Sequence, residues 1–179
     1  MTPSLKQIAL VLLAVAGPQF AQAADTASAS ATAEVLQPIA VVKGADLVFG
    51  NLVAGNGDVT VATDGARTKT GGTVLPTGGS AATAARFEVS GTGNNGFSID
   101  YTGSDSVLTS GSDTMAIDWI TEVVATQTPT GKTDASTDAT AGTLTSGAAY
   151  IYVGGKLTVD ANQPAGTYTG TVQVTLAYN

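Results

Sequence analysis

The sequence contains no cysteine and no histidine, and only 12% of its 179 residues are charged. Without cysteine the chain can form no disulfide and has no thiol nucleophile, and without histidine it lacks the most common general base. Zinc sites built from these residues are excluded, and so is a triad of serine, histidine and aspartate. These absences argue against an enzyme. Because no disulfide can form, the stability of the fold must come from strand pairing and a hydrophobic core.

Long apolar runs are also scarce, and the one that stands out lies near the N-terminus. Residues 8–16 (IALVLLAVA) follow the single charge of Lys6, and they are too few to cross a bilayer as a helix. A Gly-Pro pair comes next, and residues 21–23 (AQA) match a small-x-small cleavage site. We therefore expect a cleaved secretory signal peptide at residues 1–23 and an exported mature chain, residues 24–179, in the periplasm, at the cell surface or outside the cell. The alternative is an anchor helix or a buried helix, which the complete three-part pattern disfavours.

Basic residues are also few in this sequence. Once the expected leader is removed, six basic residues remain against fourteen acidic ones, a formal charge of −8. Such a surface repels nucleic acid and anionic lipid, so we expect neither as a partner. No later apolar run approaches the length of a transmembrane helix, so we expect no membrane span in the mature chain.

What the sequence has in abundance is alternation of apolar and polar residues, which is typical of β-strands. Glycine accounts for 22 residues, and threonine and serine are frequent, a composition that suits short strands and tight turns. The segments that alternate most clearly are residues 26–35, 39–41, 47–52, 115–119 and 168–178.

Turn signals predict how some of these strands are joined. Residues 86–101 resemble a hairpin with its turn at residues 91–96 (GTGNNG), and residues 149–159 resemble a second hairpin with a Gly-Gly turn. Residues 127–142, rich in threonine, aspartate and alanine, predict a mobile loop. Two packed antiparallel sheets bury many one-faced strands most simply. We therefore predict an all-β fold, an immunoglobulin-like antiparallel β-sandwich of about eight to ten strands, as a single domain over residues 24–179.

Metal and cofactor sites have little support in the sequence. Asp134 and Asp138 could offer oxygens to a calcium ion, but their spacing matches no known loop, and a solvated acidic loop is the better interpretation. Residues 91–96 match a dinucleotide fingerprint by letters alone, without the strand and helix that it requires. We predict no metal and no cofactor.

Two further candidate sites are equally weak. Trp119, Tyr150 and Tyr152 could form a sugar-stacking platform, although such aromatics more often cover a sheet or lie in a core. Asp118 and Glu122 could pair for glycoside hydrolysis, but on a strand they lie about 13 Å apart, beyond the usual separation of catalytic carboxylates. We predict no catalytic residue.

The C-terminal segment, residues 164–179 (PAGTYTGTVQVTLAYN), carries the most specific pattern. One parity is apolar and the other polar, so a strand here can bury one complete face. The pattern continues almost to the last residue, so the edge of this strand must be paired or protected. The candidate strand-pairing and assembly motif consists of Gly166, Tyr168, Gly170, Val172, Val174, Leu176 and Tyr178.

This segment resembles the C-terminal signature of pilin subunits assembled by the chaperone–usher route. That signature has a glycine, then alternating apolar residues, then a penultimate aromatic, and Gly166 and Tyr178 stand at its first and last positions. More broadly, residues 27–179 resemble the bacterial domain family of unknown function 4402. The segments that carry this resemblance are the alternating Ala/Thr start, Leu47-x-Phe49-Gly50, residues 87–91 (FEVSG), Val153-Gly154-Gly155-x-Leu157 and Pro164-x-Gly166-Thr167-Tyr168-x-Gly170.

The resemblance implies an exported surface or fimbria-like role, with like subunits or a periplasmic chaperone and usher as partners, but it supplies no activity. Two function classes therefore stay open. The first is a structural subunit that acts through β-strand pairing, and the second is a self-complete secreted binding module for carbohydrate or matrix components. The apolar positions of residues 26–35 are mostly alanine, which would bury little area in a donor strand.

Overall fold

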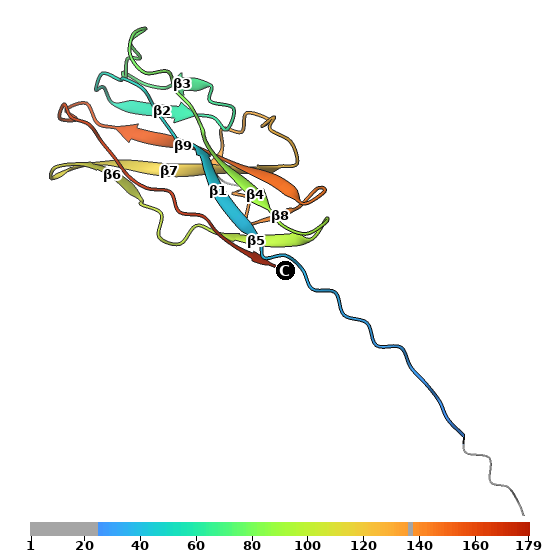
Figure 1. Ribbon diagram of the computed structural model, residues 1–179. Helices are drawn as coiled ribbons and strands as arrows, with labels where there is room; N and C mark the ends of the chain where they lie inside the picture. The colour runs from blue at the N-terminus through green and yellow to red at the C-terminus, as the bar shows by residue number, and fades with distance from the viewer. Residues whose placement is uncertain (1–24, 136–137) are drawn as a thin grey trace, which may run out of the picture. The chain divides into compact units, whose positions relative to one another are not determined.

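The computed structural model describes residues 25–135 and 138–179, and the expected signal peptide, residues 1–23, lies outside them. The described residues contain ten β-strands and no α-helix. All strand pairs are antiparallel, and they form two sheets (Figure 1). The predicted all-β sandwich is therefore confirmed. No helix in this part of the chain is long and apolar enough to cross a membrane.

The described N-terminal residues contain no strand. Residues 25–34 belong to a separate unit from residues 35–179, and their side chains are exposed. The alternation over residues 26–35 predicted a strand, and this prediction is wrong for the single chain. Small alanine side chains bury too little apolar area to offset the conformational entropy that an ordered strand loses.

Seven strands form the larger sheet and three form the smaller one. The strands of the smaller sheet lie in the order β10–β5–β8. The larger sheet consists of β1 (Ala40–Ala45), β2 (Gly57–Val61), β3 (Arg67–Lys69), β4 (Ala85–Ser90), β6 (Val107–Ser110), β7 (Asp113–Val124) and β9 (Ala148–Val159). The smaller sheet consists of β5 (Gly96–Asp100), β8 (Ala141–Thr143) and β10 (Thr175–Tyr178).

Strand β9 is the centre of the larger sheet. One of its edges pairs with β7, while the other pairs with β4 along its first half and with β2 along its second half. The change of partner falls at Gly154, where a Cβ atom would contact the carbonyl oxygen of Val61, and a Cβ on Gly155 would lie 3.0 Å from Cζ of Phe49. The predicted Gly-Gly turn is therefore wrong, because the two glycines permit close approach within one continuous strand.

The predicted hairpin over residues 86–101 is also wrong. Strand β4 pairs with β1 and β9 in the larger sheet, whereas β5 pairs with β10 and β8 in the smaller sheet. Residues 91–95 still turn, as expected, but they carry the chain from one sheet to the other. Alternation identifies which face of each strand is buried, but it does not identify the strand's partner.

Two hydrophobic clusters fill the sandwich. The first, here called the closed core, draws its buried residues from both sheets and from residues next to them, and the second, the groove core, draws them from the larger sheet alone. The closed core consists of Ala85, Val89, Phe97, Ile99, Leu144, Ala149, Ile151 and Val153. The groove core consists of Val59, Leu108, Met115, Ile117, Leu157 and Val159. Trp119 packs against both.

The groove core is covered mainly by irregular chain. Residues 46–54, here called the strap, were predicted to include a short strand over 47–52, but they make only isolated bridges at Val48 and Val53. The strap nevertheless turns its apolar side chains onto the sheet. Those that pack against the groove core are Leu47, Phe49, Leu52 and Ala54, joined by Leu75 and Tyr168 from elsewhere in the chain.

The loop between β7 and β8 is attached to the larger sheet by a buried carboxylate. Glu122 accepts hydrogen bonds from the Thr63 hydroxyl at 2.5 Å and from the Thr130 hydroxyl at 2.6 Å. Farther along the loop, Asp138 accepts a hydrogen bond from the backbone N–H of Thr121 at 3.1 Å. Within the described residues, no group of three or more acidic side chains is placed to hold a metal ion.

Candidate functional site

A groove of about 1030 Å³ opens over the groove core. One wall is the strap, which follows β1, and the other wall is the segment of residues 163–172, which precedes β10. The course of both segments along the chain can be followed in Figure 1. The floor comes from four strands of the larger sheet. Its residues are Ala85, Phe87, Leu108, Met115, Ile117, Trp119 and Leu157.

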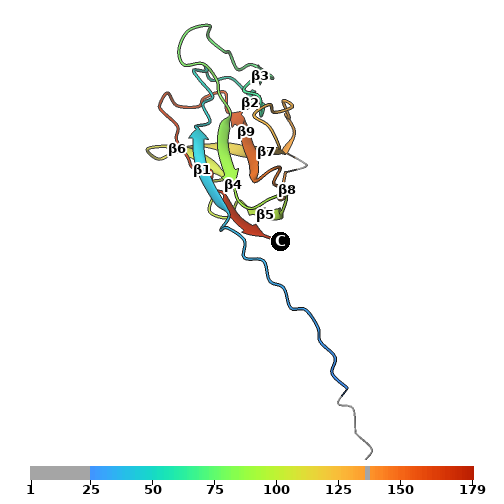
Figure 2. The same cartoon turned by 45° about the vertical axis from the view of Figure 1, so that its right-hand side comes forward.

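The strands that flank this side of the sandwich each have an unpaired edge. In the described part of the chain, β1 pairs only with β4 and β10 pairs only with β5. The two strands are neighbours in space but belong to different sheets (Figures 1 and 2). A sandwich open in this way offers backbone N–H and C=O groups to an additional strand.

The C-terminal motif divides between the groove and the closed core. Residues 171–179 alternate between exposed and half-buried, as the sequence predicted, although the regular strand β10 begins only at Thr175. Four motif residues line the groove, namely Gly166, Tyr168, Gly170 and Val172. The others, Val174, Leu176 and Tyr178, pack against the closed core, and Val172 contacts it as well.

Hydrogen bonds fix the C-terminal wall against β6 and the residues before it. Thr169 and Thr109 exchange two backbone hydrogen bonds of 2.9 Å, and the backbone N–H of Thr171 donates to Oδ2 of Asp105 at 2.6 Å. A Cβ atom on Gly170 would lie 2.6 Å from Cδ2 of Leu108, so a larger residue here would require the Leu108 side chain to shift. The wall is therefore held in place through its backbone, and Tyr168 and Val172 line the groove from it.

Tyr178 joins the beginning of the sandwich to its end. Its hydroxyl accepts a hydrogen bond from the backbone N–H of Thr92 at 2.8 Å and donates one to the carbonyl oxygen of Gln37 at 3.0 Å. The backbone N–H of Gln37 donates in turn to the Thr92 hydroxyl at 2.7 Å. The penultimate aromatic therefore ties β10 to the residues that lead into β1 and to the turn between the two sheets.

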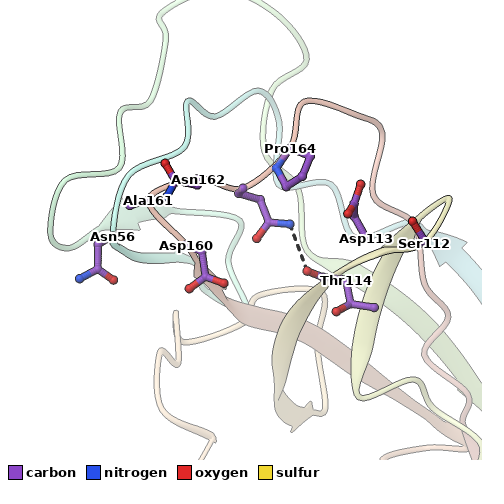
Figure 3. Close-up of a pocket in the computed structure, with 9 residues that line it drawn as sticks. Asn56, Ser112, Asp113, Thr114, Asp160, Ala161, Asn162 and Pro164 are labelled. Atoms are coloured by element: carbon purple, nitrogen blue, oxygen red, sulfur yellow. Dashed lines mark hydrogen bonds between the residues drawn. The ribbon is translucent and has the colours of Figure 1, made fainter.

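A smaller hollow of about 610 Å³ lies between the β6–β7 turn and the loop that follows β9 (Figure 3). Asp113 and Thr114 line one side, and Asp160 and Asn162 line the other. The side-chain amide of Gln163 donates to the carbonyl oxygen of Thr114 at 3.0 Å, as the dashed line in Figure 3 marks. This hollow is polar and lacks the apolar floor of the groove.

The other candidates from the sequence are not brought together. Trp119 lies on the inner face of the larger sheet, where its indole N–H donates to the carbonyl oxygen of Asp105 at 2.8 Å. Tyr150 and Tyr152 have the opposite parity on β9 to Ile151 and Val153 of the closed core, and Tyr152 is buried, so the three aromatics form no platform. Asp118 is exposed and pairs with Lys156 at 3.3 Å, whereas Glu122 is buried and bound by threonines.

The C-terminal wall of the groove contains four residues of the motif predicted from the sequence, whereas the strap and the floor were not predicted to belong to a site. Leu47 and Phe49 gave a usable signal, since they alternate and precede Gly50, but this pattern was interpreted as a strand. The contribution of Arg67, which contacts the strap from β3, left no signal in the sequence because a single arginine on a polar segment indicates no partner.

The comparison with known families covers the whole sandwich. A family model described as a domain of unknown function, DUF4402, matches residues 39–178, from just before β1 to the last residue of β10. Among curated proteins, no sequence matches this chain. Because the match spans most of the sequence, the chain belongs to the DUF4402 family.

Proposed function

We propose that this chain is a non-enzymatic, exported, pilin-like or fimbria-like structural subunit that assembles at the cell surface by pairing β-strands. The groove carries the proposal. It combines an apolar floor with two walls of extended or irregular backbone. Residues of β1, which has an unpaired edge, contribute to its lining, and its C-terminal wall leads into β10, which also has an unpaired edge. An extended strand of a neighbouring subunit would gain affinity from main-chain hydrogen bonds and from burying one face of its side chains.

The titratable groups support a structural role over a catalytic one. Burial raises the pKa of Tyr101 to about 12, and its hydroxyl donates to the carbonyl oxygen of Ala139 at 3.1 Å. The side-chain hydrogen bond from Thr102 lowers the pKa of Asp100, which is exposed. Neither group lines the groove, and each has a local structural partner.

A self-complete secreted binding module for carbohydrate or matrix components is the second candidate. The polar hollow in Figure 3 favours it, since Asp113, Asp160 and Asn162 offer the oxygen and amide groups that sugar hydroxyls bind. Strand pairing would use the groove, whereas carbohydrate binding would use the polar hollow. Variants in the groove therefore distinguish the two functions.

The test compares assembly of the mature chain with that of two matched variants. Val172→Asp puts a charge on the groove wall, and Gln173→Asp puts the same charge on the exposed parity of the same segment. Strand-mediated assembly predicts concentration-dependent oligomers in sedimentation velocity for the wild type and for Gln173→Asp, and monomers for a folded Val172→Asp. A wild type that stays monomeric at all concentrations, and that binds no extended peptide, would contradict the proposal.

A further inference from the structure

The strap is held over the groove core at three places. At its two ends it makes backbone bridges. The backbone N–H of Val48 donates to the carbonyl oxygen of Thr83 at 2.9 Å, and the backbone N–H of Val53 donates to the carbonyl oxygen of Val74 at 2.9 Å. Between these bridges the attachment comes from a side chain. Nη1 of Arg67, at the start of β3, donates to the carbonyl oxygen of Phe49 at 2.7 Å and to that of Asn51 at 3.1 Å.

The backbone between those carbonyls is shaped to receive the guanidinium. Gly50 has a φ of 71°, a left-handed conformation that favours glycine. A Cβ atom at this position would lie 2.6 Å from Nη1 of Arg67 and 2.7 Å from the carbonyl oxygen of Ser80. The strap therefore bends around the arginine head group, and hydrogen bonds from a charged donor are stronger than those between neutral groups.

Part of the floor is covered, although Phe87 and Trp119 are only half-buried. Leu108, Met115 and Ile117 are 7%, 4% and 5% exposed, although they line the groove. Phe49 is the strap residue next to the Arg67 bond, and its ring lies on this floor beside Gly155. A strand entering the groove meets a floor that is already covered in part by Phe49, so large inward side chains would have to displace the strap.

We propose that Arg67 determines the specificity of the groove, because it holds the strap closed and so restricts the groove to strands with small inward side chains. This inference rests on the proposed function and names the chemistry of its partner, an extended strand whose inward positions are alanine or a residue of similar size. Residues 27–33 of a second copy have alanine at every second position, and these small side chains match the groove. Arg67 acts here as a positioning residue, since it works through the strap.

The first measurement uses amide hydrogen exchange in the full mature chain to test whether Arg67 holds the strap in place. Arg67→Ala removes both strap bonds, and Lys69→Ala removes the same charge from an exposed position on the same strand. In Arg67→Ala the amides of Val48 and Val53 should exchange about tenfold faster or more, because the strap opens locally, whereas Lys69→Ala should leave them unchanged. Unchanged exchange of these amides in Arg67→Ala would show that Arg67 does not hold the strap in place.

The second measurement tests selectivity with two synthetic peptides. One has the sequence of residues 24–36 (ADTASASATAEVL), and the other carries leucine at positions 29 and 31. The wild type and Lys69→Ala should bind the alanine peptide about tenfold more tightly than the leucine peptide, and Arg67→Ala should lose most of this preference. Arg67→Lys, which keeps the charge and can bind one carbonyl, should retain an intermediate preference and provides a folded comparison if Arg67→Ala is unstable.

The outcomes separate the two proposals. If the wild type binds neither peptide, the strand-pairing function is overturned at this groove. The exchange data alone then decide whether Arg67 holds the strap in place. If the wild type binds both peptides equally, or if Arg67→Ala keeps the wild-type preference, the specificity role is overturned even though the groove binds strands.

Discussion

The closed core and the groove core lie along the same strand, β9, but they are covered in different ways. Its first half faces the closed core, where Phe97 and Ile99 of the smaller sheet complete the packing. Its second half faces the groove core, where the strap and Tyr168 take the place of a second sheet. The first half is covered by a second sheet, whereas the second half is covered mainly by irregular chain. Stability and recognition are therefore expected to reside in different halves of one domain.

The largest effect should come from breaking the closed core. Phe97 is fully buried, so Phe97→Ala should reduce the free energy of unfolding by about 3–5 kcal/mol, since it leaves a cavity between the two sheets. Urea denaturation of the mature chain measures this loss. A loss below about 1 kcal/mol would mean that the closed core is not the main source of stability.

Leu176 tests whether the C-terminal strand belongs to the closed core. It is half-buried and pairs with Ile99, so Leu176→Ala should cost about 2 kcal/mol, at the low end for a buried leucine. Thr175→Ala, on the exposed parity of the same strand, should stay within about 0.5 kcal/mol. Equal losses for the two variants in urea denaturation would overturn the assignment of faces.

Phe49 provides the matched truncation in the groove core. It is half-buried on the strap, and the strap can relax around the change, so Phe49→Ala should cost only about 1–2 kcal/mol of stability. The same variant should admit the leucine peptide, because it removes the ring that covers the floor. A stability loss equal to that of Phe97→Ala would remove the distinction between the two cores.

The smallest effect should be an acid-dependent one that leaves both cores intact. Burial opposes ionisation of Glu122, but hydrogen bonds from Thr130 and Thr63 and the charge of Lys132 outweigh it and lower the pKa. A carboxyl whose folded pKa is lowered stabilises the fold above its unfolded pKa, about 4.3, and that contribution is lost as the pH falls through the lower folded value.

The melting temperature of the wild type should therefore fall more between pH 5 and pH 3 (roughly the window set by these pKa values) than that of Glu122→Gln. Trp119 emission should not change in the same interval below the melting temperature, since the Glu122 network lies on the outer face of the larger sheet. Identical pH dependence in the two proteins would show that Glu122 contributes nothing to acid stability.

The sequence allowed the faces of the strands to be predicted but not their partners. Met115 and Ile117 on β7, and Val172 to Tyr178 at the C-terminus, bury the parity that their alternation indicated. Alternation is a local property of each strand. Pairing depends on which elements meet in space, and for that reason β4 and β5 were assigned to one hairpin although they lie in different sheets.

The groove was only partly predictable for the same reason. The C-terminal wall has a strong alternating pattern, whereas the strap takes its shape from contacts with residues distant in sequence, such as Arg67 and Thr83. Glycines were a source of error as well. Gly154 and Gly155 resemble a turn in sequence, but they serve the close approach of β2 and Phe49 to an uninterrupted strand.

The central claim is that the groove accepts an extended strand, and Trp119 allows the most direct test. It is the only tryptophan in the chain, and it lies on the groove floor at the boundary between the two cores. Titration of the mature protein with the peptide of residues 24–36 should shift the emission to shorter wavelength and reduce quenching by acrylamide, with saturation and with no such change in a folded Val172→Asp. Emission and quenching that stay constant at all peptide concentrations would contradict the account.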